Sequence, residues 1–203
     1  MVKRSEMRSP AQQPVVVVSG LPRSGTSLAM RMIEAGGLPV LTDNVRRADV
    51  DNPGGYYEFE PVKRTRQDSR WLAEARGKAV KMVYRLLYDL PPDYSYQLIL
   101  MQRSMAEVLA SQQKMLQRLG TADPKVGLEQ MGRLLRRELN ECEAWLAKQP
   151  NFSILPVSYN KLVADPAPIA DEINRFLGGS LTVSTMLEVV DPTLYRNRQP
   201  QPS

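Results

Sequence analysis

The sequence predicts an α/β fold with a mostly parallel central sheet that is flanked by helices. Four short apolar segments, at 15–19, 79–83, 97–101 and 152–157, have the length and composition of buried strands. Segments with helical spacing of apolar residues separate them along the chain. Strands that alternate with helices are joined by crossovers, so we expect parallel pairing with helices on both faces, which makes three layers.

Five helices are expected, at 27–35, 61–75, 105–119, 126–148 and 166–176. The last of them has Asp165 at its N-cap position and Pro166 at its first helical position, and Gly178 and Gly179 end it. The longest carries an apolar stripe that we interpret as core: Leu128, Met131, Leu135, Leu139, Cys142 and Leu146.

The length of 203 residues predicts one domain, at 14–190, that buries roughly 70% of its unfolded surface. The segment 1–13 is polar and is predicted to be disordered. The segment 191–203 is predicted to be a partly ordered tail.

The first strand runs into a glycine-bounded loop that is typical of phosphate binding. Gly20 and Gly25 are separated by four residues, as in a P-loop, but Thr26 stands where the P-loop lysine belongs. Arg23 supplies the positive charge instead, and its guanidinium can grip an oxyanion through two parallel hydrogen bonds. The following helix adds N–H groups and its positive dipole end, so the loop predicts an anion site in a P-loop-like fold. An ordinary strand–turn–helix corner is the alternative.

A second strand–helix corner follows the strand at 97–101. Ser104 and Glu107 have capping-box spacing, which predicts a helix start. Arg103 ends the strand and Ser111 follows it eight residues later. An arginine and a hydroxyl at the carboxyl end of a strand suit a second phosphate, whereas a surface arginine and a tolerated helix hydroxyl are the alternative.

The two corners together resemble those of sulfotransferases that use 3′-phosphoadenosine 5′-phosphosulfate (PAPS). The string at 22–27, PRSGTS, is similar to the family's 5′-phosphosulfate loop, and the spacing of Arg103 and Ser111 is similar to its 3′-phosphate motif. The segment 52–58 resembles the Asn-Pro-x-Gly-Tyr-x-Glu loop of a bacterial branch. The segment 159–162 resembles a Tyr-Glu-Asp-Leu motif, although Asn160 and Lys161 replace its acidic pair.

The resemblance implies PAPS as co-substrate, 3′,5′-bisphosphoadenosine (PAP) as product, and no metal. It assigns the 5′-phosphosulfate to Arg23 with Ser24, Gly25, Thr26 and Ser27, and the 3′-phosphate to Arg103 and Ser111. Arg196 and Arg198 are candidates to close over the 3′-phosphate, and a solvated basic tail is their alternative.

Lys81 interrupts an apolar strand, where a lysine is rarely buried without an anionic partner. It corresponds roughly to a family lysine that neutralises the bridging oxygen, so we expect it to be catalytic together with Arg23. An outward-facing lysine on an edge strand is the alternative.

Sulfuryl transfer to a hydroxyl requires a base, and the chain has no histidine. A carboxylate therefore has to serve, and we select Glu58, which lies in a glycine-rich loop where an acceptor pocket can form. Glu60 and Asp43 are the other candidates, Asp43 because some family members place a carboxylate about twenty residues after the loop arginine. A solvated loop carboxylate is the alternative for Glu58.

The amino-acid composition limits the classes of molecule that the protein is expected to bind. The net charge of +5 suits an anionic ligand or nucleic acid, but the basic residues are dispersed and no nucleic-acid motif occurs. A single cysteine, Cys142, indicates a reducing compartment, and no apolar run approaches the roughly 18 residues of a membrane span, so a cytoplasmic protein with no membrane partner is expected. The acceptor is expected to be a small molecule, a carbohydrate or a phenol that offers a hydroxyl or an amine. Its contact candidates are Tyr56, Tyr57 and Trp71. No pattern in the sequence predicts the oligomeric state.

Two other functions remain open from the residues. A nucleotide kinase or hydrolase on the same architecture would need magnesium, which the absent loop lysine disfavours. A non-catalytic nucleotide-binding protein that retains the loop without a base is the second alternative.

Overall fold

The computed structural model describes residues 13–43, 55–118, 120 and 127–191. A five-stranded sheet has the order β2-β3-β1-β4-β5, and every neighbouring pair is parallel. The strands are β1 (Val15–Gly20), β2 (Val40–Leu41), β3 (Ala79–Lys81), β4 (Tyr96–Gln102) and β5 (Phe152–Ser158). The predicted α/β class with a parallel sheet between helices is confirmed.

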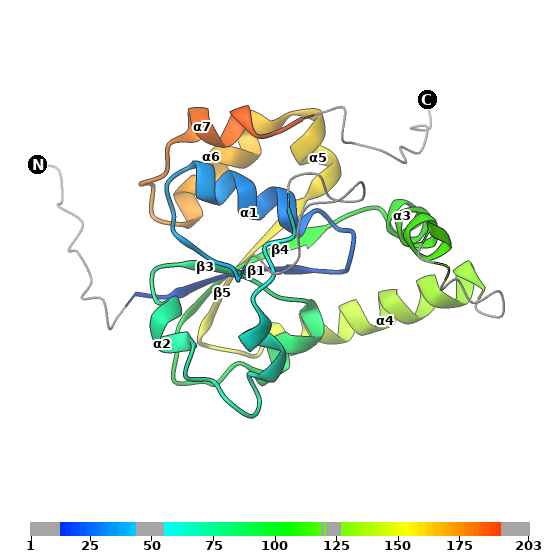
Figure 1. Ribbon diagram of the computed structural model, residues 1–203, viewed down its shortest axis with the longest axis horizontal. Coiled ribbons are helices and arrows are strands. Elements are labelled where there is room, and N and C mark those ends of the chain that lie inside the picture. Colours follow the sequence, from blue (N-terminus) through cyan, green and yellow to red (C-terminus); the bar gives the residue numbers. More distant parts are fainter. Residues whose placement is uncertain (1–12, 44–54, 119, 121–126, 192–203) are drawn as a thin grey trace, which may run out of the picture.

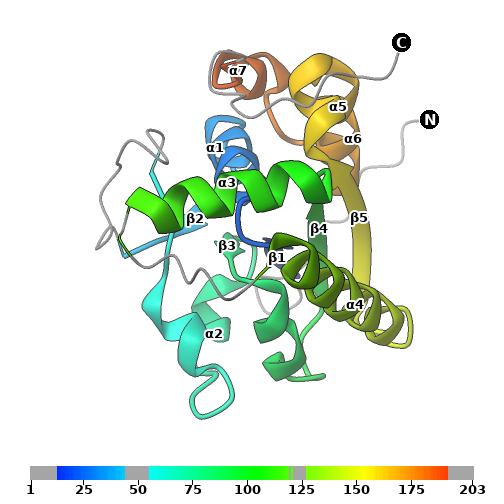
Figure 2. The same ribbon diagram turned by 90° about the vertical axis from the view of Figure 1, so that its right-hand side faces the viewer.

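Helices cover both faces of the sheet (Figure 1). One face carries α1 (Thr26–Ala35), α5 (Tyr159–Ala164), α6 (Pro166–Phe176) and α7 (Val183–Glu188). The other carries α2 (Leu72–Ala75), α4 (Leu128–Leu146) and the 3₁₀ helices η2 (Glu60–Arg64) and η3 (Tyr84–Asp89). Figure 2 shows α3 (Met105–Arg118) lying across the carboxyl edge of the sheet.

The side chains of β1 explain its central position. Val15 and Val17 belong to one hydrophobic core and Val16 and Val18 to the other, and none of the four is more than 3% exposed. Alternate residues of a strand point to opposite faces, so a strand buried on both faces must be apolar throughout. The run of four valines therefore forms the middle of the sandwich.

The prediction of one continuous helix at 61–75 is wrong. Only η2 and the short α2 form there, because local side chains compete for the backbone bonds that a helix needs. Thr65 Oγ1 donates to the carbonyl oxygen of Val62 and accepts from Trp71 Nε1, while Asp68 accepts from the backbone N–H and the Nε of Arg70. Trp71 is thereby buried, at 7% exposure, as a packing residue.

The other predicted helices form with small shifts at their ends, whereas β2, η3, α5 and α7 were not predicted. The expected stripe of α4 is buried only in its second half, at Cys142 and Leu146, and Leu128 is 40% exposed. Within the described ranges, none of the helices combines the length and apolar character that a membrane crossing requires.

Candidate active site

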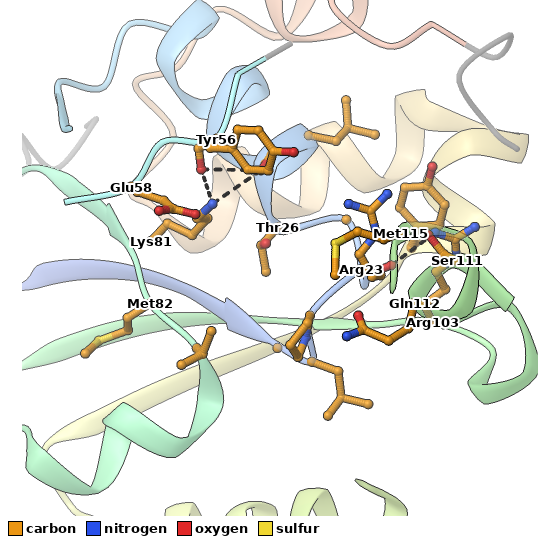
Figure 3. A pocket seen from close by; sticks show the side chains of 18 of the residues that line it. Arg23, Thr26, Tyr56, Glu58, Lys81, Met82, Arg103, Ser111, Gln112 and Met115 are labelled. Carbon is orange, nitrogen blue, oxygen red and sulfur yellow. Dashed lines mark hydrogen bonds between the residues drawn. The ribbon is translucent and has the colours of Figure 1, made fainter. Parts of the chain in front are cut away.

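Strand register brings the predicted cations to one edge of the sheet. Gly20 at the end of β1 is paired with Met101 of β4, and Val18 is paired with Lys81 of β3. Because these strands are parallel, their carboxyl ends meet, and the segments that follow them face one space. Arg23, Lys81 and Arg103 all line that space (Figure 3).

The loop between β1 and α1 has the tight geometry of a phosphate loop. Arg23 (φ 70°) and Gly25 (φ 98°) both adopt left-handed backbone conformations. A Cβ atom on Gly25 would stand 2.2 Å from Cδ2 of the buried Tyr159 ring. Only glycine fits this position, because it must accept both the positive φ and the close approach of an aromatic ring.

Gly25→Ala is therefore expected to lower the free energy of unfolding by more than the strain of a positive φ alone explains. Gly37 is the matched control, since it has φ 102° and, apart from its own atoms and its two chain neighbours, none of the described residues has an atom within 4 Å of the place that its Cβ would occupy. We expect Gly37→Ala to lower the free energy of unfolding by about 1–2 kcal/mol and Gly25→Ala by a further 1–3 kcal/mol or so from overpacking. Urea unfolding of the two variants measures the difference. Equal losses of stability would show that the Tyr159 ring moves away from the added methyl group without a loss of free energy.

The two predicted phosphate corners touch each other. Arg23 Nε donates to Ser111 Oγ at 2.9 Å, and Arg103 Nη1 donates to the carbonyl oxygen of Arg23 at 3.0 Å. These contacts join the loop after β1 to the helix after β4, across 88 and 80 positions of sequence. The residues that the sequence assigned separately to a 5′ and a 3′ phosphate thus form one continuous cluster.

Arg103 is buried among groups that fix its orientation. Its Nε bonds to Oε2 of Glu107 at 3.0 Å, with the two side chains only 7% and 3% exposed. Its guanidinium also lies over the Tyr159 ring, 4.5 Å from the centroid. Burial raises the pKa of Tyr159, and the nearby arginines oppose that shift. Glu107, which the sequence assigned to a helix cap, therefore serves as the counter-charge of Arg103.

Lys81 reaches the beginning of α1. Its Nζ donates to the carbonyl oxygen of Tyr56 and, at 3.4 Å, to Ser27 Oγ, and it stands 5.9 Å from the Tyr56 ring centroid. In Figure 3 the Lys81 ammonium, Tyr56 and Glu58 gather on the opposite side of the cavity from Arg103 and Ser111. Lys81, which ends β3 and does not lie in mid-strand as predicted, is thus directed into the site.

The three candidate bases differ in position. Glu58 lines the cavity, whereas Glu60 and Asp43 do not. Asp43 Oδ2 accepts the backbone N–H of Glu60 at 2.6 Å, and the Glu60 carboxylate pairs with Lys63. The backbone carbonyl of Glu58 is held by the N–H of Asp43 and by Thr42 Oγ1, so both other candidates help to shape the loop that presents Glu58.

Not every predicted ligand residue faces the cavity. Gly25, Thr26 and Ser27 line it, but Ser24 does not: it is 1% exposed and its N–H donates to the carbonyl oxygen of Leu21 at 3.1 Å. Ser24 therefore shapes the turn. Tyr57 also lies outside the cavity wall, with its hydroxyl bonded to Glu34, and burial raises its pKa. Arg196 and Arg198 lie outside the described residues.

The cavity has a volume of about 730 Å³, and its wall contains polar residues that the sequence analysis missed. Arg31 Nε and Gln112 Oε1 are both buried with no hydrogen-bond partner among the described residues, although both side chains line the cavity. Arg31 follows Ser27 by four positions on α1, so helical spacing alone could have placed it on the same face. Buried polar atoms without partners are rare in proteins and suit a polar ligand.

Together, a parallel sheet, a glycine loop at its central strand and converging arginines define an α/β protein with a P-loop-like fold and a cationic cavity. The family model described as "Sulfotransferase domain" matches residues 13–202. The chain belongs to this family, whose sulfuryl donor is PAPS. Among curated protein sequences, no significant relative matches this chain.

Several solved structures match, and two of them illustrate the shared fold. The sulfotransferase domain of the Synechococcus PCC 7002 olefin synthase superposes with a TM-score of 0.54 at 16% identity, covering 98% of this chain and 94% of that one. Retinol dehydratase, solved with androsterone and the inactive cofactor PAP, gives a TM-score of 0.52 at 16% identity, covering 91% of this chain and 66% of that one.

The residues present fit the donor that the family uses. A bisphosphorylated nucleotide with a sulfuryl group carries several negative charges, and the cavity offers Arg23, Arg31, Lys81 and Arg103. The described residues contain no cluster of three or more His, Cys, Asp or Glu side chains suited to a metal ion.

Proposed function

We propose that this cavity transfers the sulfuryl group of PAPS to the hydroxyl of a small acceptor and releases PAP, with Glu58 as the base. The contact of Arg23 with Ser111, together with that of Arg103 with the Arg23 carbonyl, carries the proposal. A nucleotide with phosphates at both the 5′ and 3′ positions requires two anion sites at a fixed separation, and these contacts join the two corners rigidly.

The nucleotide is assigned by charge and by donor geometry. Arg23 and the start of α1 at Thr26 and Ser27 hold the 5′-phosphosulfate, where the helix dipole favours an anion. Arg103 and Ser111 hold the 3′-phosphate. Bound there, PAPS supplies an activated sulfuryl group with a phosphate leaving group.

The protein's part in the chemistry falls to Glu58 and Lys81. The Glu58 carboxylate accepts the proton of the acceptor hydroxyl, which makes the oxygen a better nucleophile. The Lys81 ammonium, held beside Ser27, stabilises the negative charge that develops on the leaving phosphate. Their position together on one side of the cavity supports a reacting centre there (Figure 3).

The cavity wall supports an apolar acceptor over a carbohydrate. Residues close in sequence to Glu58 and Lys81 contribute mostly hydrocarbon and aromatic surface: Phe59, Val62, Met82, Val83 and Leu86. Carbohydrates are bound through many hydrogen bonds, whereas a phenol or another hydrophobic alcohol gains free energy when it buries its skeleton on such a wall.

The nucleotide assignment predicts a specific order of ligands in thermal unfolding. PAP without magnesium is expected to raise the melting temperature more than ADP or magnesium-ATP at equal concentration, because only PAP occupies both anion corners. A greater stabilisation by magnesium-ATP than by PAP would contradict the assignment and favour the kinase or hydrolase alternative.

A cytoplasmic location is proposed from the state of Cys142. The thiol is buried, burial raises its pKa to about 11, and its Sγ contacts the Tyr84 carbonyl oxygen at 3.8 Å. A protonated, enclosed thiol serves as a packing group and has no need of an oxidising compartment.

A further inference from the structure

Asn160 connects two parts of the 3′ corner. This residue stands in the first turn of α5, where the resembling motif has an acidic residue. Its Nδ2 donates to Glu107 Oε1 at 3.1 Å, and its Oδ1 accepts the backbone N–H of Ser104 at 3.2 Å. One donor and one acceptor are used in opposite directions, which an amide provides and a carboxylate does not.

Glu107 needs the bond from Asn160 because it is buried. Its side chain is 3% exposed, and its other oxygen accepts from Arg103 Nε at 3.0 Å. A buried carboxylate is tolerated when a counter-charge and hydrogen bonds replace the lost water. The Asn160 amide fixes one oxygen of the carboxylate, so the other is presented to Arg103 in one orientation.

The orientation of Glu107 in turn fixes the orientation of the Arg103 guanidinium. Glu107 holds its Nε, the Arg23 carbonyl oxygen accepts from its Nη1 at 3.0 Å, and the ring of Tyr159, the residue before Asn160, has its centroid 4.5 Å from the guanidinium. A guanidinium binds phosphate through N–H groups that lie in a rigid plane. The angle of that plane therefore determines how well these N–H groups align with the phosphate oxygens.

We propose that Asn160 is a positioning residue that acts through Glu107 on Arg103 and thereby gives the site its preference for nucleotides with a 3′-phosphate. The inference rests on the proposed function and assigns to Asn160 the task of discriminating PAP from adenosine 5′-phosphate (AMP). It also accounts for the amide in place of the acidic residue, because a carboxylate here would face the Glu107 carboxylate.

Asn160→Asp is the sharpest test. It retains the acceptor for the Ser104 N–H, removes the donor to Glu107 and adds a like charge beside it. Calorimetric titration is expected to show PAP binding weakened about 10–100-fold, the range for a lost hydrogen bond to a charged group, with AMP binding unchanged. Asn160→Ala is expected to weaken PAP about tenfold on the same grounds. Asn140→Ala, at an exposed position of α4, is the control and should match the wild type.

A double-mutant cycle separates positioning from general damage to the fold. In an Arg103→Ala background, Asn160→Ala should cause no further loss of PAP affinity, since the residue through which it acts is gone. Thermal unfolding without ligand shows which variants are folded. If Asn160→Asp does not fold, the test is made with Asn160→Ala.

Three results would overturn the inference or its basis. An unchanged ratio of PAP to AMP affinity in both Asn160 variants overturns the inference, and so do additive losses in the cycle. A wild-type protein that binds PAP no better than AMP overturns the proposed function itself, which distinguishes that failure from failure of the Asn160 assignment.

Discussion

Replacing Arg103 with alanine is expected to weaken PAP binding by about 2–5 kcal/mol, the cost of leaving a buried charge without its partner. The 3′-phosphate loses a guanidinium whose side chain is only 7% exposed. The loop loses the hydrogen bond from Nη1 to the carbonyl oxygen of Arg23 as well. Calorimetric titration with PAP and AMP should show the larger loss for PAP.

The effect on the fold has to be separated from the effect on binding, because Arg103→Ala removes an ion-pair partner of the buried Glu107. Removing one partner of a buried ion pair costs about 3–5 kcal/mol of stability, whereas replacing both by apolar residues is often neutral. We therefore expect the double variant Arg103→Met, Glu107→Leu to regain stability while its PAP affinity stays low. Recovery of PAP affinity in the double variant would show that the single change acts through the fold.

Arg133→Ala is a suitable control for charge alone. Arg133 lies on α4, is 69% exposed and pairs with the exposed Glu129. Exposed ion pairs contribute little, so neither stability nor PAP affinity should change measurably.

Replacing Glu58 with glutamine is expected to lower kcat by about 10²–10⁴, the usual contribution of a general base, with PAP affinity nearly unchanged. Glutamine keeps the size of the side chain and one acceptor oxygen, but it cannot accept the proton. Single-turnover measurement of sulfuryl transfer to a phenolic acceptor, together with PAP titration, separates chemistry from binding.

Glu60→Gln is the matched control for this change. Glu60 belongs to the same segment, but its carboxylate pairs with Lys63 and does not line the cavity, so its loss should leave kcat as in the wild type. The opposite pattern, with an active Glu58→Gln and an inactive Glu60→Gln, would transfer the role of base to Glu60. A wild type that binds PAP and transfers nothing to any acceptor would favour the non-catalytic alternative.

Most of the sheet could be predicted because strand formation depends on short, local patterns. The four valines of β1 and the apolar runs of β4 and β5 indicate burial by composition alone. By contrast, β2 has only two residues, Val40 and Leu41, and no two-residue pattern predicts a strand. The failed helix at 61–75 shows the same limit, since the hydrogen bond from Trp71 to Thr65 decides the local path.

The site divides in a similar way. Gly20, Gly25, Arg23 and Arg103 were recognisable from the sequence, because a loop that binds an anion after a strand requires particular residue types at fixed spacing. Arg31 and Gln112 were missed, since a polar residue on a helix acquires meaning only when the cavity beside it is known.

The sequence by itself determined the α/β class, the two strand–helix corners and the absence of a histidine base, because each depends on composition or on residues close together in the chain. Only the tertiary structure decided which atoms meet. The parallel register of β1, β3, β4 and β5 joins Arg23 to Ser111, directs Lys81 to Ser27 and places Asn160 against Glu107, over separations of 88, 54 and 53 residues. It also placed Glu58 on the cavity wall and left Glu60 and Asp43 off it, because facing a cavity is a property of the folded chain and has no counterpart in residue spacing.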